Sequence, residues 1–115
     1  MDPVQVFKAL SDATRLRCMV LLAGNDELCV CEMTHALGLP QPKISHHLGG
    51  LRKTGLVTDR KAGLWTYYRI NPELDPWVKE LINTTTTGIR SQYPFAADGM
   101  ALREMPNRPG AACCA

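Results

Sequence analysis

The sequence predicts a small, mainly α-helical domain that carries one β-hairpin and ends in a flexible tail. Apolar residues recur at helical spacing in five segments before residue 90. Between the fourth and fifth segments, residues 56–70 instead form two runs rich in Val, Thr, Trp and Tyr. From residue 91 onward, three prolines interrupt a stretch without sustained periodicity. We therefore expect one folded domain over residues 1–90 and a flexible, cysteine-terminated tail over residues 91–115.

The first two helices follow from the start of the chain. The spacing of Val4, Phe7 and Leu10 predicts a short helix after Pro3. Ser11 is a residue type that caps helices, so we expect it to begin the second helix. The inner, apolar stripe of that helix comprises Leu16, Met19, Val20 and Ala23.

The third and fourth helices are expected to form a helix-turn-helix. A short helix over residues 30–37 should end at Gly38, because Gly is a natural C-terminal cap and Pro40 cannot continue the turn. The fourth helix then begins near Gln41, with Pro42 tolerated in its first turn. Its inner stripe consists of Ile44, Leu48 and Leu51. Its outer, exposed face is expected to carry Lys43, His46, His47 and Gly50.

A hairpin and one more helix complete the domain. Gly55 ends the fourth helix, and residues 56–70 are expected to form two strands joined by a turn near residues 61–63. Asp75 and Pro76 open a fifth helix. Its apolar stripe is Leu74, Val78, Leu81, Ile82, Thr85 and Ile89. A helix-turn-helix followed directly by a hairpin is a winged helix-turn-helix.

The charge distribution indicates a nucleic-acid partner. Residues 41–70 hold six basic residues and one acidic residue and so carry +5, whereas the whole chain carries only +2. Such a patch is typical of a surface that contacts phosphates, although an ordinary solvated face is the alternative. The second helix of a helix-turn-helix, the recognition helix, fits the major groove of double-stranded DNA. The base-contact candidates are Gln41, Lys43, Ser45, His46 and His47, and the phosphate-contact candidates are Arg52, Lys53, Arg60 and Lys61.

Dimerisation would extend this short binding surface. A single domain reads only a few base pairs, and two symmetric copies on a palindromic site read more. The first and fifth helices have apolar faces that the helix-turn-helix does not need, so we expect them to form a homodimer interface. A chain that acts as a monomer stays open as an alternative. For His46 and His47, a solvated helix face or a metal site stays open as an alternative to DNA contact.

The chain is expected to stay in the cytoplasm without a membrane partner. No apolar run approaches the roughly 18 residues that span a bilayer, and the N-terminus lacks the features of a signal peptide. Cytoplasmic thiols are kept reduced, so the five cysteines favour metal binding or redox chemistry over a disulfide framework. Cys18 lies among apolar helical residues and is interpreted as part of the core.

Cys29 and Cys31, at the start of the third helix, are the main candidate ligands. A helix N-terminus favours the thiolate, which binds soft metal or metalloid ions. Residues two apart in a helix point about 200° apart, so the two sulfurs should not reach one ion unless the first turn is extended or unwinds. Ligand binding would then distort the helix that supports the recognition helix and lower DNA affinity. A pair of half-buried thiols without a ligand is the alternative.

Three segments together resemble the ArsR/SmtB family of winged-helix repressors, especially its arsenic-responsive branch. They are FKALSDATRLRCMVLL, ELCVCEM and QPKISHHLGGLRKTGLVTDRKAGLWTYYRINPEL, within about residues 5–75. The resemblance implies a homodimer that represses a resistance operon and leaves its operator when the inducer binds. In the arsenic branch the inducer is arsenite or antimonite, with no other cofactor, and its C-V-C thiolates correspond to Cys29 and Cys31.

One position departs from the arsenic branch. Many arsenic sensors have a third cysteine where this chain has Thr34. Arsenite prefers three sulfurs, so Cys113 and Cys114 of the tail are candidate ligands. A tail of this length has a root-mean-square span of about 25 Å and could approach the site of either protomer. The alternative is an oxidation-prone tail without this role.

Three other functions stay open at this point. Cadmium- and lead-responsive repressors of the same family also combine C-x-C with distant cysteines, so sulfur ligands alone do not name the ion. A thiol-redox-responsive repressor would form disulfides at the same cysteines. A small thiol enzyme is a different class, but the sequence has neither a phosphate-cradling loop nor a C-x-x-C pair, so we expect no enzyme.

Overall fold

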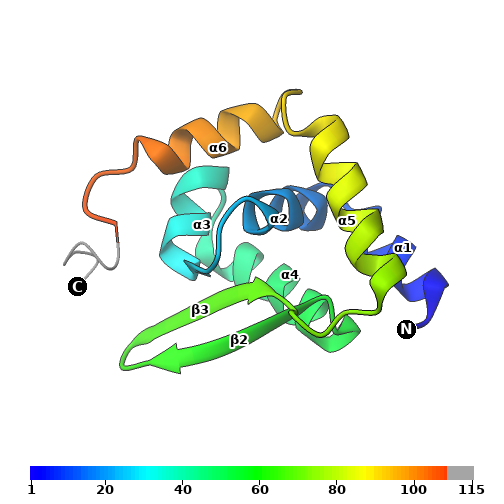
Figure 1. The fold of residues 1–115 in the computed structure, drawn as a ribbon. Coiled ribbons are helices and arrows are strands. Elements are labelled where there is room, and N and C mark those ends of the chain that lie inside the picture. The colour runs from blue at the N-terminus through cyan, green and yellow to red at the C-terminus, as the bar shows by residue number, and fades with distance from the viewer. Residues whose placement is uncertain (109–115) are drawn as a thin grey trace.

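The structure, a computed structural model, describes residues 1–108. Within this part of the chain, six helices and three short strands follow one another (Figure 1). They are α1 Pro3–Leu10, α2 Ala13–Ala23, β1 Leu28–Cys29, α3 Val30–Leu37, α4 Gln41–Thr54, β2 Val57–Ala62, β3 Trp65–Ile70, α5 Pro76–Ile89 and α6 Phe95–Arg103. None of these helices is long and apolar enough to cross a membrane.

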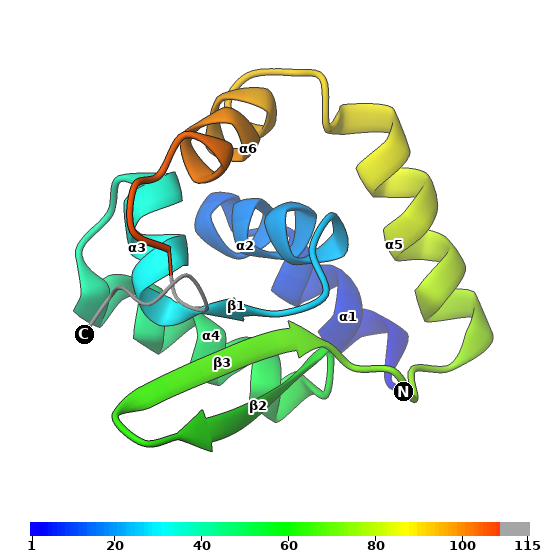
Figure 2. The same cartoon turned by 60° about the vertical axis from the view of Figure 1, so that its left-hand side comes forward.

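Helix α2 lies at the centre of the fold, and the other helices surround it (Figure 2). Its residues Cys18, Met19 and Leu22 are at most 2% exposed. Leu48 of α4 and Val78 of α5 belong to the same buried cluster. Because burial of apolar area is the main favourable term in folding, this cluster fixes where α4 and α5 lie.

The helix-turn-helix has the predicted bounds. Helix α3 ends at Leu37, and Gly38 follows with a φ of 66°, a left-handed conformation that costs Gly little. Ile44, Leu48 and Leu51 of α4 are each 0% exposed, as their spacing predicted. The inner stripe of α4 therefore faces the core, and its opposite side faces solvent.

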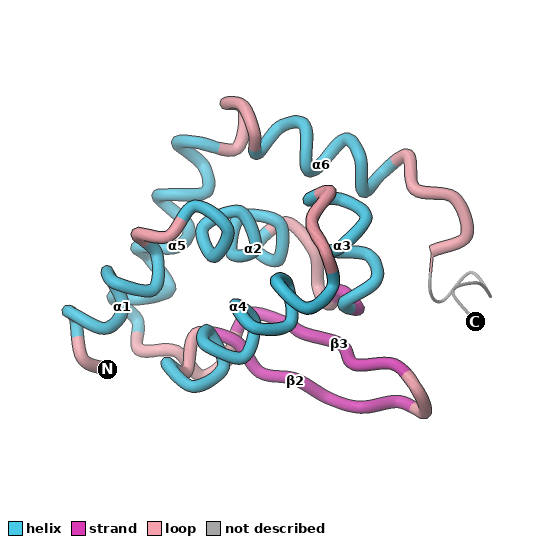
Figure 3. Tube along the Cα trace, turned by 180° about the vertical axis from the view of Figure 1, so that it is seen from behind, coloured by secondary structure: helices cyan, strands magenta, loops and turns pink. Residues whose placement is uncertain are grey.

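The hairpin is also confirmed, and a third strand accompanies it. Strands β2 and β3 pair antiparallel over their whole length, with Gly63 at a φ of 62° in the turn. The two-residue strand β1 pairs with the other edge of β3, which gives the order β1-β3-β2. Strand β1 was not predicted, because two residues are too few to show alternation. Figure 3 shows the hairpin extending away from the helices beside α4.

The boundary between the first two helices corrects one prediction. Asp12, rather than Ser11, caps α2: its Oδ2 accepts a hydrogen bond from the backbone N–H of Arg15 at 3.0 Å. The Ser11 hydroxyl instead donates to the Lys8 carbonyl at 2.8 Å, at the end of α1. Both side chains satisfy backbone groups that a helix end leaves without partners.

Helix α1 keeps apolar side chains on the surface. Val6 and Ala9 are the buried residues of α1, whereas Val4 and Phe7 of the predicted stripe are 60% and 56% exposed. Val4 and Phe7 of the α1 stripe are thus available to another molecule, as a dimerisation role requires, while Leu10 packs against the core.

Helix α5 begins at Pro76 as predicted. The predicted apolar stripe of α5, unlike that of α1, is mostly buried. Leu74, Val78 and Ile82 are 4%, 0% and 5% exposed.

The prediction of a flexible tail from residue 91 is wrong over residues 95–103, which form α6. This helix lies across α2 and α3 (Figures 1 and 2). Asp98 of α6 is 3% exposed and accepts two hydrogen bonds from Arg17, at 2.9 Å from Nε and 2.7 Å from Nη2. The same Nη2 donates to the Leu37 carbonyl at 2.9 Å. This buried ion pair attaches α6 to the helix-turn-helix.

Candidate functional site

The N-terminal half of α4 presents four of the five predicted base-contact residues to solvent. Gln41, Lys43, Ser45 and His46 are all exposed. The buried stripe on the opposite side of α4 holds this face outward. An exposed, polar and basic helix face of this kind can enter a major groove.

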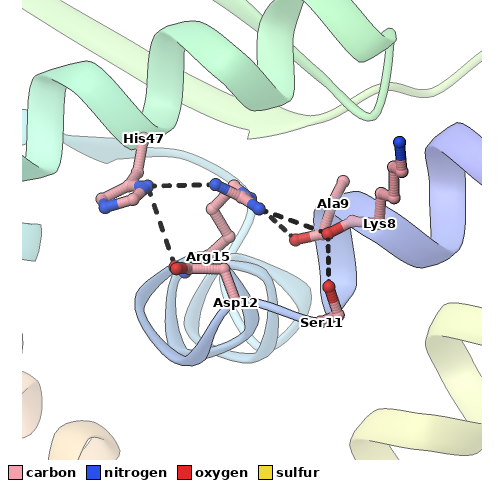
Figure 4. A network of polar contacts seen from close by, with 6 residues as sticks. All are labelled: Lys8, Ala9, Ser11, Asp12, Arg15 and His47. Carbon is pink, nitrogen blue, oxygen red and sulfur yellow. Dashed lines mark hydrogen bonds and ion pairs between the residues drawn. The ribbon is translucent and has the colours of Figure 1, made fainter.

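His47 does not share this exposed face, and the prediction that it lies there is wrong. Its side chain is 14% exposed and points toward α2 (Figure 4). Its Nδ1 atom lies 3.8 Å from Oδ2 of Asp12 and 3.4 Å from Nη1 of Arg15. His47 follows Ile44 by three residues and precedes Leu51 by four, which places it beside the buried stripe. The sequence therefore contained the signal for this position.

Arg15 extends the contact from α4 to the end of α1. Its Nε donates to the Ala9 carbonyl at 2.9 Å, and its Nη2 donates to the Lys8 carbonyl at 3.2 Å (Figure 4). The last carbonyls of a helix lack partners within the helix, so Arg15 satisfies two groups at the end of α1. The network therefore links the position of α4 to both α1 and α2.

These surroundings favour a neutral His47 ring. Burial away from water lowers the pKa of His47 most, and the Arg15 guanidinium lowers it further, while the Asp12 carboxylate opposes both. Since arginine only donates hydrogen bonds, Nδ1 of His47 accepts and the ring proton lies on Nε2. His47 then adds no charge to the basic face of α4.

Arg60, a predicted phosphate contact on β2, contacts Glu27 in the segment before β1 and Tyr67 on β3. Its Nε and Nη2 each donate to a carboxylate oxygen of Glu27 at 2.7 Å. Its guanidinium lies 4.6 Å from the centre of the Tyr67 ring. The two hydrogen bonds from Arg60 lower the pKa of Glu27. The positive charge of Arg60 is therefore balanced locally.

The other three phosphate-contact candidates lie along the end of α4 and the wing. Arg52 Nη1 lies 3.2 Å from Oδ2 of Asp59, within the same basic segment. Lys53 and Lys61 are exposed. The two lysines are therefore the better-placed pair for a phosphate backbone.

Cys29 is the N-cap residue of α3 and not a helical residue, since its φ and ψ are −82° and 161°. Its Sγ accepts a hydrogen bond from the Glu32 backbone N–H at 3.4 Å, and its own N–H donates to Oε1 of Glu32 at 2.9 Å. This is a capping box with Cys in the place usual for Ser or Thr. Cys29 is 0% exposed, and Cys31 is half-buried.

The sulfurs of Cys29 and Cys31 are joined as a disulfide. Unwinding of α3, one of the two expected conditions for this, is not observed, whereas an extended start, the other expected condition, is observed at Cys29. Because Cys29 precedes the helix, its extended backbone brings the two Cα atoms to 5.4 Å while α3 keeps all eight residues. Two reduced thiols at these positions could face one bound atom without unwinding α3.

Glu32 connects this thiol pair to the C-terminal part of the chain. It is 3% exposed, and its Oε2 accepts a hydrogen bond from Nε of Arg108 at 2.7 Å. A buried carboxylate needs such a charged partner. Sequence reasoning missed both residues. The spacing of Cys29 and Glu32 was a capping-box signal, but no local pattern indicates Arg108, 76 residues away.

The remaining cysteines are divided between the core and the end of the chain. Cys18 is 0% exposed, which confirms its interpretation as a core residue, and this burial raises the pKa of its thiol to about 12. Cys113 and Cys114 lie outside the described residues. Within residues 1–108, no group of three or more His, Cys, Asp or Glu side chains is arranged to hold a metal ion.

The sequence matches the model of the bacterial regulatory protein arsR family over residues 12–59. It is 47% identical to the arsenic resistance transcriptional regulator ArsR2 of Pseudomonas putida, over 97% of both chains. The chain belongs to the ArsR family. It is 48% identical to the arsenical resistance operon repressor of Escherichia coli, over 70% of this chain and 69% of that one. A CadC homolog of Staphylococcus aureus, a cadmium resistance regulatory protein, is 39% identical over 71% of this chain and 65% of its own.

Solved structures share the fold of this ArsR-family chain. HlyU from Vibrio cholerae has a TM-score of 0.67 and 32% identity, over 75% of this chain and 89% of that one. The antimony-specific transcriptional repressor AntR has a TM-score of 0.64 and 30% identity, over 76% of each chain. The homodimeric winged helix-turn-helix DNA-binding domain Mb0332 of Mycobacterium bovis has a TM-score of 0.63 and 33% identity, over 74% of this chain and 75% of that one. The winged helix-turn-helix prediction is confirmed.

The ArsR-family match covers most of the candidate site. Residues 12–59 include the thiol pair, Glu32 and all five base-contact candidates. Arg108 and α6 lie beyond that segment, so the contact between Glu32 and Arg108 joins the matched segment to the C-terminal part of the chain. Membership places the chain among bacterial regulatory proteins.

Proposed function

We propose that the chain is a metalloid-responsive transcriptional repressor that acts in the cytoplasm as a homodimer. It binds double-stranded operator DNA and is released when arsenite or antimonite binds cysteine thiolates, with no other cofactor. The observation that carries this proposal is the position of Cys29, which caps α3 and pairs with β3 of the wing. The names of the arsenic regulators and of AntR among the related proteins support the choice of inducer.

In the DNA complex, α4 enters the major groove. Glutamine can pair with adenine through two hydrogen bonds, and lysine reaches guanine acceptors. Base contacts are assigned to Gln41, Lys43, Ser45 and His46, and phosphate contacts to Arg52, Lys53, Arg60 and Lys61. His47, which points toward α2, positions α4 instead of touching DNA.

The homodimer uses α1 and α5. Val4 and Phe7 of α1 and Trp77 of α5 are large apolar residues with 60%, 56% and 40% exposure. Covering them with a second copy removes apolar surface from water, which favours association. The homodimeric state of the Mycobacterium bovis domain supports this arrangement.

Inducer binding is a condensation on thiols. Each thiol gives its proton to a hydroxyl of As(OH)₃, one water leaves, and one As–S bond forms without electron transfer. Cys29 and Cys31 supply two sulfurs, and Cys113 or Cys114 supplies the third. The contact of Arg108 with Glu32 brings residue 108 close to the Cys29–Cys31 pair. The five residues from 108 to 113 can span about 17 Å, so a terminal thiol can reach the same protomer's pair.

The coupling to DNA acts through the contacts of Cys29. Its sulfur accepts the Glu32 N–H, and an arsenic atom on that sulfur competes with this bond. Its backbone pairs with Tyr67, whose ring lies under Arg60 of the wing. Loading the site therefore shifts the start of α3 and the wing relative to α4, and this shift favours the state with lower DNA affinity.

A thiol-redox-responsive repressor is a second candidate, because the Cys29–Cys31 disulfide favours it. The two thiols would give two electrons and two protons to a peroxide, whose O–O bond breaks as the S–S bond forms, and the peroxide would leave as two waters or as one water and one alcohol. Loss of operator binding with peroxide, but not with arsenite, would support this candidate over the first.

Gel-shift titration with the DNA in front of the gene for this chain tests the proposal. The reduced protein should bind this DNA and leave it when arsenite or antimonite is added, with cadmium, lead and zinc as comparisons. Cys29→Ser and Cys31→Ser should bind DNA as the wild type does and ignore arsenite, whereas Cys18→Ala should respond. Release of the Cys29→Ser protein by arsenite would reject the proposed site.

The phosphate contacts have their own test. Lys61→Ala should weaken binding to every DNA sequence alike and should flatten the dependence of log affinity on log salt by about one unit. The matched control is Lys79→Ala, since Lys79 is an exposed lysine of α5 outside the proposed DNA face. An unchanged salt dependence in Lys61→Ala would remove the wing from the DNA interface.

A further inference from the structure

Arg60 of the wing holds a carboxylate in the way that arginine holds a phosphate. Its Nε and Nη2 donate to the two carboxylate oxygens of Glu27, each at 2.7 Å. Arginine uses the same fork of two parallel hydrogen bonds to bind phosphate oxygens. One fork cannot hold both partners at once, so Glu27 and a phosphate compete for Arg60.

The ion pair draws the Arg60 side chain across the sheet. Arg60 lies on β2, an outer strand of the order β1-β3-β2, whereas Glu27 directly precedes β1 at the opposite edge (Figure 2). The Arg60 guanidinium lies over the middle strand, 4.6 Å from the centre of the ring of Tyr67, its cross-strand partner. Release from Glu27 would let this long side chain turn outward from the edge of the wing.

A competing anion can reach this pair. The side chains of Arg60 and Glu27 are 56% and 25% exposed. Their hydrogen bonds raise the pKa of Arg60 and lower the pKa of Glu27, so both groups stay charged at neutral pH. Ion pairs in contact with water contribute little net stability. A DNA backbone, with its dense row of phosphates, is therefore able to displace Glu27.

We propose that Glu27 occupies the phosphate-binding fork of Arg60 in the DNA-free protein and that operator DNA displaces it. Glu27 thereby lowers the operator affinity of the wing by acting through Arg60. This inference rests on the proposed function, in which Arg60 contacts a DNA phosphate. Phosphate contacts carry no sequence information, so the effect of Glu27 applies to every DNA sequence alike.

Glu27→Gln tests the inference, because it removes the competing charge and keeps the size of the side chain. Fluorescence anisotropy of a labelled duplex, the DNA in front of the gene for this chain, measures the affinity. Glu27→Gln should bind about threefold to tenfold more tightly, as expected for the loss of one exposed pair in each wing of a dimer. Added salt should shrink this gain, since salt screens the pair that the wild type has to break.

A matched control separates this competition from a general loss of negative charge. An open cleft of about 670 Å³ lies beside the pair, and Glu73 lines it together with Glu27 and Arg60. Glu73 is exposed, and Glu73→Gln makes the same change of charge on the same cleft. Its affinity gain should be less than about twofold. Glu27→Asp keeps the charge and should stay within about twofold of the wild type.

A double-mutant cycle with Arg60 tests whether Glu27 acts through this one side chain. Arg60→Ala alone should weaken binding and flatten the dependence of log affinity on log salt by about one unit. In the Arg60→Ala background, Glu27→Gln should raise affinity by less than about twofold, because no fork is left to release. If circular dichroism shows that Glu27→Gln does not fold, Glu27→Ala takes its place in the cycle.

The outcomes separate the two proposals. Unchanged affinity in the folded Glu27 variant, or an equal gain with and without Arg60, would overturn the displacement of Glu27 and leave arsenite-dependent release intact. A gain in Glu73→Gln as large as that in Glu27→Gln would also overturn it. Failure of the reduced wild type to bind the DNA in front of its gene would overturn the proposed function and the inference together.

Discussion

The two ends of α3 are both held by charged residues from distant parts of the chain, but in different ways. At the C-terminal end, Arg17 donates both to the Leu37 carbonyl and to Asp98 of α6. At the thiol end, Glu32 accepts a bond from Arg108. The Arg17 and Asp98 side chains are 20% and 4% exposed, whereas Arg108 is 34% exposed. The thiol end is therefore the end whose ion pair is more open to water.

This difference indicates which end of α3 can respond to chemistry. Water screens a partly exposed ion pair, so it costs less to rearrange than an enclosed one. Bonding at the Cys29 sulfur can then move the start of α3, while the contact of Leu37 with Arg17 stays in place. We propose that helix α3 acts as an element fixed at one end and adjustable at the other.

Removing the charge of Asp98 should have the largest effect on stability. Asp98→Asn leaves Arg17 without its buried carboxylate partner, which should lower the free energy of unfolding by about 3 kcal/mol. Urea denaturation measures this change, with the exposed Glu104→Gln on the same segment as control. A loss as small as that of the control would show that α6 contributes little to holding α3.

Changes at Glu32 should have an intermediate effect. Glu32→Ala removes both the N–H acceptor of the capping box and the partner of Arg108, so it should cost about 2 kcal/mol. Glu32→Gln keeps an oxygen that can accept a hydrogen bond from the Cys29 N–H, so its free energy of unfolding should fall less than that of Glu32→Ala. If the two variants are equally unstable in urea, the capping bond is not what stabilises the start of α3.

Arg108→Ala should lower the free energy of unfolding by less again, at most about 1 kcal/mol, because the Arg108 side chain is partly solvated. Added salt should shrink the difference from the wild type, since salt screens exposed pairs. Arg108→Lys retains the charge and should restore most of the loss. A salt-independent difference would mean that Arg108 acts by packing rather than by charge.

The smallest effect concerns His47 and pH. Its folded-state pKa lies below the usual 6.5, so the unfolded chain takes up a proton first as the pH falls. His47 should therefore reduce stability as the pH drops from about 6.5 through its folded-state pKa. Urea denaturation at neutral and at acidic pH measures this change. The free energy of unfolding of His47→Gln should depend less on pH than that of the wild type. A pH dependence of His47→Gln identical to that of the wild type would contradict this account.

Local patterns predicted those elements whose ends carry strong signals. Helices α3 and α4 end at Gly38 and Gly55, each with a positive φ, and the hairpin turns at Gly63. The inner stripe of α4 also followed from spacing alone. Helix α6 could not be predicted in this way, because its buried Asp98 depends on Arg17, 81 residues away in the sequence.

At the candidate site, the bounds of α3 were predicted correctly, but the conformation of Cys29 was not. Treating Cys29 and Cys31 as two positions of one helix predicted sulfurs that point apart, whereas the extended backbone of Cys29 brings them together. His47 was misplaced although its spacing from Ile44 was informative. The contact between Glu32 and Arg108 had no local signal, because it joins residues that are 76 positions apart.

Hydrogen exchange of the α3 backbone amides, with and without arsenite on the reduced protein, tests the central claim most directly. We predict altered exchange at the Glu32 N–H, which now donates to the Cys29 sulfur, together with loss of operator binding. We predict unchanged exchange at the Gly38 N–H, which donates to the Thr34 carbonyl at the fixed end. Operator release with no change at Glu32, or equal changes at both ends, would contradict the account.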